Sequence, residues 1–474
     1  MKYIFLLISL FTFNFLQAQV TGVVKDAAGE PIPGANVFWM NTTNGVTTNE
    51  DGNFSIHKPA RSHMLVVSFI GFENDTIHVD KGNQQLDIVL REGVELSEVN
   101  VVTRKLGTMK LRTSVMNEDM ISSAELTRAA CCNLGESFVT NPSVDVSYSD
   151  AATGAKQIKL LGLSGTYVQM MTENIPNFRG AAAPYGLGYV PGPWMQSIQV
   201  SKGTSSVKNG YEAITGQINV EFKKPQLPEA DWVSANLFAS TTNRYEANAD
   251  ATLKLSKRWS TSLLVHYENE TKAHDGNDDG FVDIPQVEQY NVWNRWAYMG
   301  DHYVFQAGIK ALHETRNSGQ IAHGNTPSHD LYEIGIKTNR YEAFTKNAYI
   351  FDKEKNTNLA LILQGTLHNQ DANYGRKLYD VDQSNFYASL LFETELSKQH
   401  SLSAGLSFNY DGYDQNYRLT NQAEEGLTKK FVKESVPGAY VQYTFNLNDQ
   451  LMLMGGIRGD YSSEYGFFVT PRAH

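Results

Sequence analysis

Sulfur-containing side chains mark the first place in the sequence where binding chemistry could occur. The chain has 2 cysteines, Cys131 and Cys132, which are adjacent, and Met170 and Met171 form a second adjacent pair. Thiolate and thioether sulfur are soft ligands that favour Cu(I) and other thiophilic metals. A relaxed disulfide between neighbouring cysteines is disfavoured by its geometry. These four residues are a candidate metal site, and the alternative is that they are buried core side chains.

An acidic, glycine-containing stretch, DGNDDGFVDIP, provides a second candidate site. It places Asp275, Asn277, Asp279 and Asp283 at positions 1, 3, 5 and 9 of a loop similar to the calcium loop of an EF-hand. Gln286 stands where a bidentate glutamate normally completes the calcium coordination. We expect either a structural calcium ion in this outer loop or an ordinary acidic turn, and no other cofactor.

Catalysis and nucleic-acid binding are not indicated by the remaining residues. His313, His323 and His329 lie near one another in sequence, but their spacing fits no standard metal motif. No combination of serine, cysteine or carboxylate residues suggests a catalytic centre. The chain carries 40 Lys and Arg against 51 Asp and Glu, a formal charge of -11, which disfavours nucleic acid as a partner. We predict that the protein is not an enzyme.

The N-terminal residues 1–18 are predicted to be a signal peptide. Lys2 precedes an apolar run over residues 3–16, and Ala18 provides the small residue that a signal peptidase requires. This run is shorter than the about 20 apolar residues that a membrane-spanning helix needs. Because no later stretch is continuously apolar for that length, any further membrane insertion must use β-strands.

Residues 19–92 are predicted to form a small β-sandwich, because short β-branched runs alternate with Gly, Pro, Asn and Asp turns. The motif GxVxDxxGxPIPGANVxW, followed by TxxDGxFSI, resembles the carboxypeptidase-regulatory-like domain of TonB-dependent outer-membrane receptors of Bacteroidetes type. In those receptors this domain precedes a plug. No zinc ligands or catalytic pair are visible here, so we interpret the domain as non-enzymatic.

Residues 106–228 are similar to the plug domain of the same receptors. The segment SSAELTRAACCNLGESF fits a helical pattern, and the flanking segments fit strands, which predicts an α+β domain. The segment IQVSKGTSSVKNGYEAITGQINVEFKKP matches the closing pattern of the plug, with Gly203, Gly210 and Gly216 at expected turn positions. Asn174 and Gln217 stand where the family usually has glycine. The CCNLGESF tract also resembles a receptor subgroup associated with metal handling.

The segment over residues 95–105, ELSEVNVVTRK, resembles a TonB box. Such a segment can add as a strand to the exposed edge of a TonB-type periplasmic energy-coupling protein. The alternative is a linker or an edge strand of the plug. The residues expected to contact the partner are Glu98, Val99, Asn100, Val101, Val102 and Thr103.

Residues 229–474 are predicted to form part of an antiparallel transmembrane β-barrel. Segments of alternating apolar and polar residues, such as 303–311 and 401–410, are separated by connections that alternate between short, as at 300–302, and long, as at the loop expected over 314–339. Short periplasmic turns and long outer loops are typical of barrels in outer-membrane lipid. Aromatic residues near strand ends, among them Trp259, Trp293 and Trp296, are expected in interfacial girdles. We expect roughly eleven strands, which is half of a family barrel of about 22, in a C-terminally truncated chain.

The sequence therefore predicts a mainly β receptor of the Gram-negative outer membrane that imports a scarce small ligand, for which a metal ion or a metal chelate is one candidate. An alternative is a surface-binding or adhesion protein that uses the same barrel without active transport.

Overall fold

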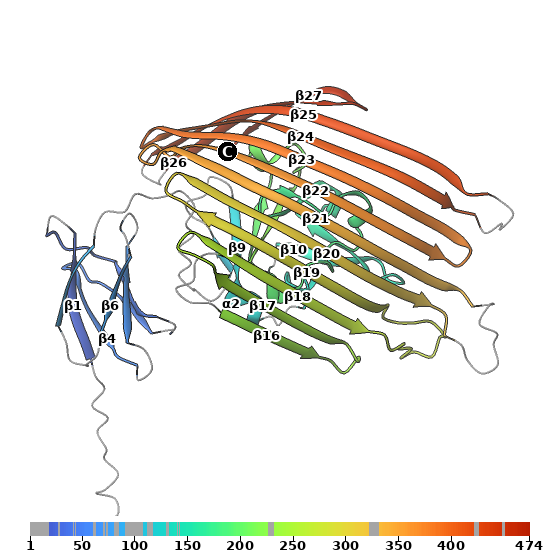
Figure 1. Ribbon diagram of the computed structural model, residues 1–474, viewed down its shortest axis with the longest axis horizontal. Coiled ribbons are helices and arrows are strands. Elements are labelled where there is room, and N and C mark those ends of the chain that lie inside the picture. The colour runs from blue at the N-terminus through green and yellow to red at the C-terminus, as the bar shows by residue number, and fades with distance from the viewer. Residues whose placement is uncertain are drawn as a thin grey trace, which may run out of the picture. The chain divides into compact units, whose positions relative to one another are not determined.

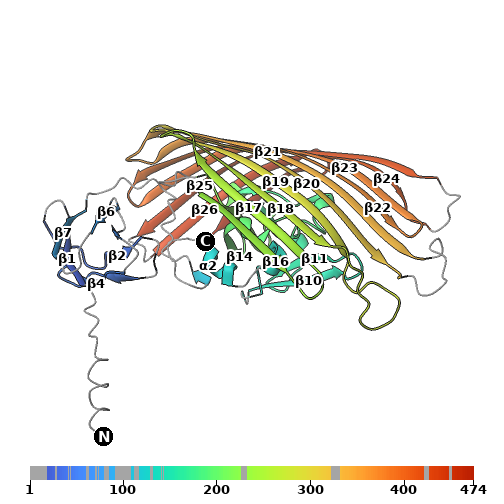
Figure 2. The same cartoon turned by 60° about the horizontal axis from the view of Figure 1, so that its bottom comes forward.

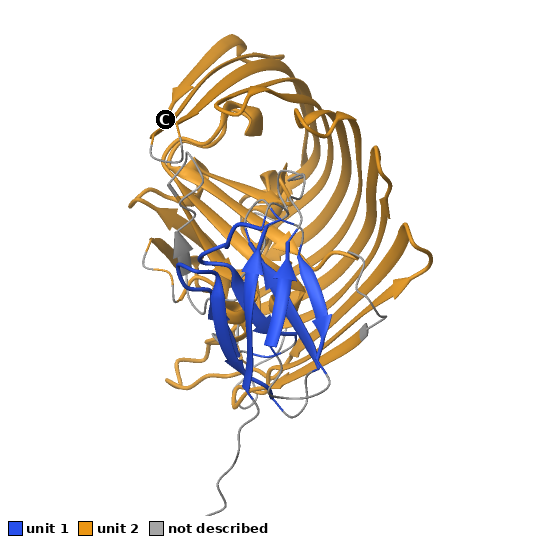
Figure 3. Cartoon of the chain, turned by 90° about the vertical axis from the view of Figure 1, so that its left-hand side faces the viewer, with its two compact units in different colours: residues 1–101 blue, residues 102–474 orange. Residues whose placement is uncertain are grey.

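The computed structural model describes residues 19–474 except 27–28, 41, 43, 60–62, 70–71, 73, 80–84, 91–107, 111–116, 129–131, 140, 142, 226–231, 322–330, 421–425 and 448–450. The chain divides into two compact units, residues 1–101 and 102–474 (Figure 3). The predicted signal peptide and the predicted TonB box both lie outside the described residues.

The first unit consists of two small sheets around one core. The sheet orders are β4-β1-β7 and β3-β2-β5-β6. The strands are β1 (Gln19–Lys25), β2 (Asn36–Trp39), β3 (Gly45–Thr47), β4 (Asn53–His57), β5 (Met64–Ser68), β6 (Asp75–His78) and β7 (Gln85–Val89). Trp39, Leu65 and Leu90 are fully buried in a core to which both sheets contribute. The predicted β-sandwich is confirmed.

In the second unit, residues 108–225 form an α+β domain, which we call the plug after the resemblance described above. Its mixed sheet has the order β13-β12-β15-β14-β9-β8, and β10 and β11 form a separate hairpin. The strands are β8 (Thr108–Lys110), β9 (Asn117–Ser122), β10 (Val144–Asp150), β11 (Ala155–Leu160), β12 (Val168–Thr172), β13 (Ile175–Pro176), β14 (Met195–Lys202) and β15 (Gly216–Phe222).

The predicted long helix is replaced by two short pieces, α2 (Ser123–Arg128) and η1 (Leu134–Glu136). Asn133 is extended, with φ -144°, and its side chain accepts a hydrogen bond from the backbone N–H of Glu136. Asparagine favours this capping position over a helix interior, so it starts a new turn. The other 3₁₀ turns are η2 (Gly165–Tyr167), η3 (Gly180–Ala182), η4 (Gly192–Trp194) and η5 (Val207–Asn209).

Glycine is required at two turns of the closing motif of the plug. Gly203 has φ +85° and Gly210 has φ +100°, values at which other residues are strained. At Gly216 the reason is space, because a Cβ atom there would overlap the Ser201 carbonyl oxygen and the Leu160 side chain. The predicted role of these glycines is confirmed.

Residues 232–473 form a twelve-stranded antiparallel sheet within the described part of the chain, with the strands in sequence order. We call it the curved sheet. Its strands are β16 (Trp232–Ala239), β17 (Tyr245–Lys254), β18 (Trp259–Glu270), β19 (Gln286–Met299), β20 (Tyr303–Gly319), β21 (Glu333–Asp352), β22 (Thr357–Tyr374), β23 (Lys377–Ser397), β24 (His400–Arg418), β25 (Thr428–Leu447), β26 (Leu451–Ser462) and β27 (Gly466–Ala473). Figures 1 and 2 show the plug on its concave side.

The two faces of the curved sheet differ in the way that the alternation predicts. In β20, Lys310 faces the plug and is 4% exposed, whereas Ile309 faces outward and is 70% exposed. Polar side chains line the inner face because the plug provides partners for them, and apolar side chains on the outer face suit lipid. None of the helices in the described ranges is long and apolar enough to span a membrane.

The expectation of roughly eleven strands agrees with the structure, which has twelve among the described residues, the last being β27. Two other expectations for the curved sheet need correction. Several strands are also longer than predicted, so β20 and β21 extend into the region 314–339 that was expected to be a loop. Trp259 and Trp296 are exposed on the outer face, but the girdle assignment is wrong for Trp293, which is 6% exposed and packs inward.

Candidate functional site

The turn between β12 and β13 is held by cations from the curved sheet. The Glu173 carboxylate lies 2.6 Å from Arg295 and 3.7 Å from the Lys346 ammonium. Lys346 also donates to the Glu173 carbonyl oxygen at 2.6 Å. Burial alone raises the pKa of Glu173, but Arg295 and Lys346 outweigh it and hold the pKa below that of an ordinary glutamate. Glu173 is therefore a charged anchor between the plug and β19 and β21.

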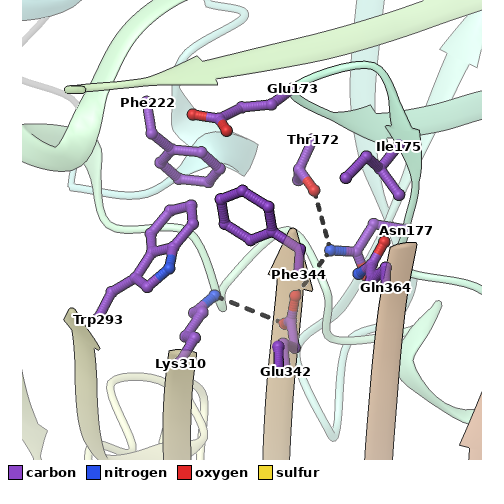
Figure 4. A pocket seen from close by; sticks show the side chains of 11 residues that line it. Thr172, Glu173, Ile175, Asn177, Phe222, Trp293, Lys310, Glu342, Phe344 and Gln364 are labelled. Atoms are coloured by element: carbon purple, nitrogen blue, oxygen red, sulfur yellow. Dashed lines mark hydrogen bonds and ion pairs between the residues drawn. The ribbon is translucent and has the colours of Figure 1, made fainter. Parts of the chain in front are cut away.

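A second set of contacts between the plug and the curved sheet lies beside the first, around a small cavity (Figure 4). The cavity measures about 20 Å³, which is room for a single water molecule. Asn177 donates to Glu342 at 3.0 Å and to Thr172 at 3.1 Å, and it accepts from Arg340 at 2.6 Å. The Lys310 ammonium lies 3.8 Å from Glu342. The Asn177 side chain thus uses its donor and its acceptor to join the plug to the curved sheet.

The far end of the curved sheet holds the plug through backbone oxygens. Arg472 of β27 donates to the carbonyl oxygens of Ser205 at 2.8 Å, Tyr211 at 3.1 Å and Ala213 at 3.2 Å. The Ser206 hydroxyl donates to Gln442 of β25 at 2.6 Å. Water can replace polar contacts of this kind when they separate, so their net stabilisation is modest. The arrangement can hold a plug and also release it.

A larger cavity lies within the plug itself and measures about 610 Å³; we call it the plug cavity. Its apolar wall includes Ile158, Val168, Met170, Phe178 and Leu187. Its polar positions include Lys156, Gln157, Gln169, Arg179 and Glu212. A cavity of this volume and lining suits a small organic molecule, since ligand pockets measure roughly 300–1,000 Å³.

A second cavity of about 360 Å³, which we call the wall cavity, lies between the plug and strands β16–β20. Arg244 dominates it, with Glu246 at 2.7 Å, Glu136 at 3.0 Å and Glu268 at 3.1 Å. Cys132 also lines this cavity. Burial, together with Glu246, raises the pKa of the Cys132 thiol, which keeps it protonated at neutral pH. A protonated thiol is a weak metal ligand.

Comparison with protein families identifies the domain type of the N-terminal sandwich and of the plug. Residues 20–102 match the family model of the CarboxypepD_reg-like domain, and residues 110–217 match that of the TonB-dependent Receptor Plug Domain. The chain belongs to the TonB-dependent receptors. This family resides in the outer membrane of Gram-negative bacteria and consists of transporters rather than enzymes.

Individual relatives of this receptor differ in what they carry. The TonB-dependent receptor SusC of Bacteroides thetaiotaomicron is 29% identical over 245 residues, covering 48% of this chain and 24% of SusC. The ferripyoverdine receptor of Pseudomonas aeruginosa shares the fold with a TM-score of 0.61 at 14% identity, covering 81% of this chain and 57% of that structure. The copper transporter OprC matches with a TM-score of 0.60 at 12% identity, covering 75% and 55%. The match spans less than two thirds of each relative, and at these identities the structures establish the fold alone.

The predicted soft-metal residues do not converge in the described structure of the receptor. Cys132 lines the wall cavity and Met170 the plug cavity, while Cys131 lies outside the described residues. Met171 is fully buried. Met170 and Met171 are consecutive in β12, and consecutive strand residues point to opposite faces. Soft-metal binding by these residues stays a prediction.

The predicted calcium loop folds on itself. The Asp275 carboxylate accepts from the backbone N–H groups of Asp279 at 3.2 Å and Gly280 at 2.9 Å, and Asn277 donates to Asp279 at 3.0 Å. Asp283 accepts from the Gly276 N–H at 2.6 Å. Calcium binding there stays a prediction.

Metal-binding clusters and histidines give no further site in the described structure. Across the ranges that the structure describes, no group of three or more His, Cys, Asp or Glu side chains could hold a metal ion. Of the three histidines considered above, His313 lies 2.8 Å from the side chain of Asn339, and the other two fall outside the described residues.

Sequence reasoning missed the residues that join the plug to the curved sheet, namely Glu173, Asn177 and Arg179. They lie in TENIPNFRG, within a passage that resembles the plug, but their partners are more than a hundred residues away. Asn174, which stands where the family has glycine, has φ +62°. Asparagine tolerates this conformation better than most residues. The sequence signal that could have found these residues was a polar strand–turn segment in which Asn174 replaces the usual glycine of the family.

Proposed function

We propose that this receptor is an energy-coupled importer, in which a ligand binds above the plug and a periplasmic TonB-type partner pulls on the N-terminal side of the plug. Hydrogen bonds between the plug and the curved sheet support this proposal. Asn177 and Arg472 hold the plug through hydrogen bonds that water can replace once the plug moves.

The coupling partner would bind residues 98–103 as an added strand, through main-chain hydrogen bonds. Deleting these residues is expected to abolish uptake while leaving surface binding of the ligand intact. The measurements are uptake and cell-surface binding of the same labelled ligand in the full-length protein. Unchanged uptake would contradict import and favour the adhesion alternative.

We propose a metal ion or a metal chelate as the first class of cargo to test. Support comes from the sulfur residues in the sequence and from the shared fold with a copper transporter and a ferripyoverdine receptor. A strain lacking the receptor is expected to grow poorly on limiting iron or copper and to contain less of that metal. Normal growth and metal content would contradict a metal cargo and favour a peptide or sugar ligand.

A further inference from the structure

The wall cavity contains a buried carboxylate that has no cationic partner in the described structure. Glu270, the last residue of β18, is 7% exposed and lines this cavity. The Thr242 hydroxyl donates to its Oε1 atom at 3.0 Å. Its Oε2 atom accepts no hydrogen bond from the described residues, yet this atom is not closed off from solvent. The Oε2 atom of Glu270 is therefore open to the cavity.

The charged groups nearest to Glu270 are committed to other partners. They are Arg244, Glu268 and His274. Arg244 is enclosed by the three carboxylates described above. The Nε2 atom of His274 lies 2.5 Å from the Thr242 carbonyl oxygen, to which it donates. Neither Arg244 nor His274 forms an ion pair with Glu270 in the part of the chain that the structure describes.

The lining of the wall cavity as a whole has one positive charge too few. Three cations and four carboxylates line it, namely Lys156, Arg244, Arg316, Glu136, Glu268, Glu270 and Glu314. All of these carboxylates except Glu270 have a cation within 4 Å: Glu136 has Arg244 and Lys156, Glu268 has Arg244, and Glu314 has Arg316. A ligand with one positive charge would balance Glu270, whereas an anion would have to compete with carboxylates already in place.

The wall cavity lies at the end of the curved sheet that carries the longer connections. Thr242 belongs to the turn 240–244 and Ile284 to the loop 271–285, and both residues line the cavity. The opposite ends of β19 and β20 are joined by the short turn 300–302. Long loops face the outside in outer-membrane barrels. A ligand that arrives from outside therefore reaches this end of the sheet first.

The size of the cavity and the rest of its lining suit a small organic group. A volume of about 360 Å³ is at the lower end of the roughly 300–1,000 Å³ that ligand pockets measure. Phe238, Leu187 and Pro285 present apolar surface to it. An ammonium or guanidinium group forms strong hydrogen bonds with a single carboxylate, whereas Ca²⁺ needs six to eight oxygen ligands.

We infer that the wall cavity binds a small organic cation, whose ammonium or guanidinium group donates to the Oε2 atom of Glu270. The inference deepens the proposed import function, on which it rests, by naming a charge class for the cargo. A metal chelate belongs to this class only when its organic shell carries such a positively charged group.

The test uses three probes that share one ring and differ in charge: benzylamine, benzyl alcohol and benzoate. Each is titrated at neutral pH into the full chain in detergent micelles, with empty micelles as the blank, and binding is measured by ligand-observed NMR. We expect benzylamine to bind at least about tenfold more tightly than benzyl alcohol, because its hydrogen bond to Glu270 joins two charges. Benzoate should bind most weakly. Equal or tighter binding of the alcohol or of benzoate would overturn the inference, as would no binding of benzylamine.

Two variants place the binding in the wall cavity. Glu270→Gln keeps an oxygen that can accept from Thr242 but removes the charge, so benzylamine should bind no more tightly than the alcohol. Ile284→Trp enlarges a half-buried side chain of the lining and should weaken every probe that binds. A wild-type preference for benzylamine in the first variant, or wild-type affinities in the second, would overturn the inference.

The matched control is Glu288→Gln in β19. Gln289 lines the wall cavity, and consecutive strand residues point to opposite faces, so Glu288 points away from it. The Tyr290 hydroxyl donates to Glu288 at 2.9 Å. This variant removes the same charge close by and should keep the preference for benzylamine. Loss of the preference here would show that the charge of the region, and not Glu270, selects the cation.

The outcomes for the two proposals can be told apart. If uptake depends on residues 98–103 but benzylamine does not bind, the inference about the cargo fails and import stands. If benzylamine binds with the expected preference while uptake ignores that deletion, import fails and the cavity assignment stands.

Discussion

At the scale of single residues, loss of one partner of the buried Glu173–Arg295 pair should destabilise the fold far more than loss of one partner of an exposed pair. The two side chains are 3% and 2% exposed. Glu173→Gln leaves the Arg295 charge buried without its partner, which typically costs about 3–5 kcal/mol. We expect a lower free energy of unfolding in a urea titration of the full chain in micelles.

A matched control for this substitution is Asp301→Asn. The Arg258–Asp301 pair has a distance of 2.8 Å, but its side chains are 53% and 72% exposed. Exposed pairs contribute about 0–1 kcal/mol, so this variant should unfold almost as the wild type does. Equal losses in the two variants would show that the Glu173 contact is no anchor.

The pH dependence of stability follows in part from Glu212. Burial raises its pKa, Asp411 and Glu434 add to the effect, and Arg179 opposes it; Tyr211 and Tyr413 also face Arg179. Glu212 therefore gains its negative charge at a higher pH than an ordinary glutamate, whose pKa is about 4.3. Because the folded state binds this proton more tightly than the unfolded chain does, stability should fall as pH rises through this raised value.

The variant Glu212→Gln provides the check on this assignment, measured by urea titration of the full chain in micelles at several pH values. It should flatten the dependence of the free energy of unfolding on pH over this range. A profile that keeps its slope in the variant would assign the titration to another group.

At the scale of elements, the two faces of β20 should respond in opposite ways to the same substitution. Ile309→Lys puts an ammonium on the outer face, which costs about 2–4 kcal/mol near the middle of a bilayer. Gln306→Lys puts it on the inner face, where Lys310 already lies. We expect the first variant to reduce assembly into membranes, scored by resistance to urea extraction, and the second to leave it unchanged. Similar extraction of both variants would contradict the assignment of faces.

The same strand shows why its faces were predictable and its end was not. The alternation of Ile309 and Lys310 is a local signal, set by burial on one side and lipid on the other. From Glu314 to Gly319 the strand continues, but the alternation of apolar residues stops. The ladder hydrogen bonds to β21 persist there without it. Sequence patterns reflect the environment of the side chains. The end of this strand is set by backbone hydrogen bonding, which leaves no such pattern.

The site was less predictable than the strands because its contacts are distant in sequence. Glu173 and Arg295 are separated by 122 residues, and nothing near either residue marks the other. Trp293 was assigned to a girdle since it is aromatic and lies in a strand, yet it packs at 4.5 Å against Phe222 of the plug. Its neighbour Arg295 lies 4.5 Å from the Trp293 ring, so one short segment provides both an apolar and a charged contact.

At the scale of the whole molecule, the two units should unfold separately. The first unit has its own core, which includes Trp39 and Leu65, whereas the core of the second unit joins Val220 of the plug to Leu264 of the curved sheet. No residue is shared between these two cores of described residues. We therefore expect two transitions in a thermal scan of the full chain, one for each core.

Single core substitutions can assign each transition. Trp39→Ala removes a fully buried aromatic side chain, which typically costs about 3–5 kcal/mol, and should lower only the transition of the first unit. Val220→Ala, in the fully buried centre of β15, should lower only the transition of the second. If each substitution moved both transitions, the units would be one cooperative body. In that case, a force applied to the segment between the two units would act on the sandwich as well as on the plug. If the transitions are separate, we expect the force to unfold or displace the plug without unfolding the sandwich.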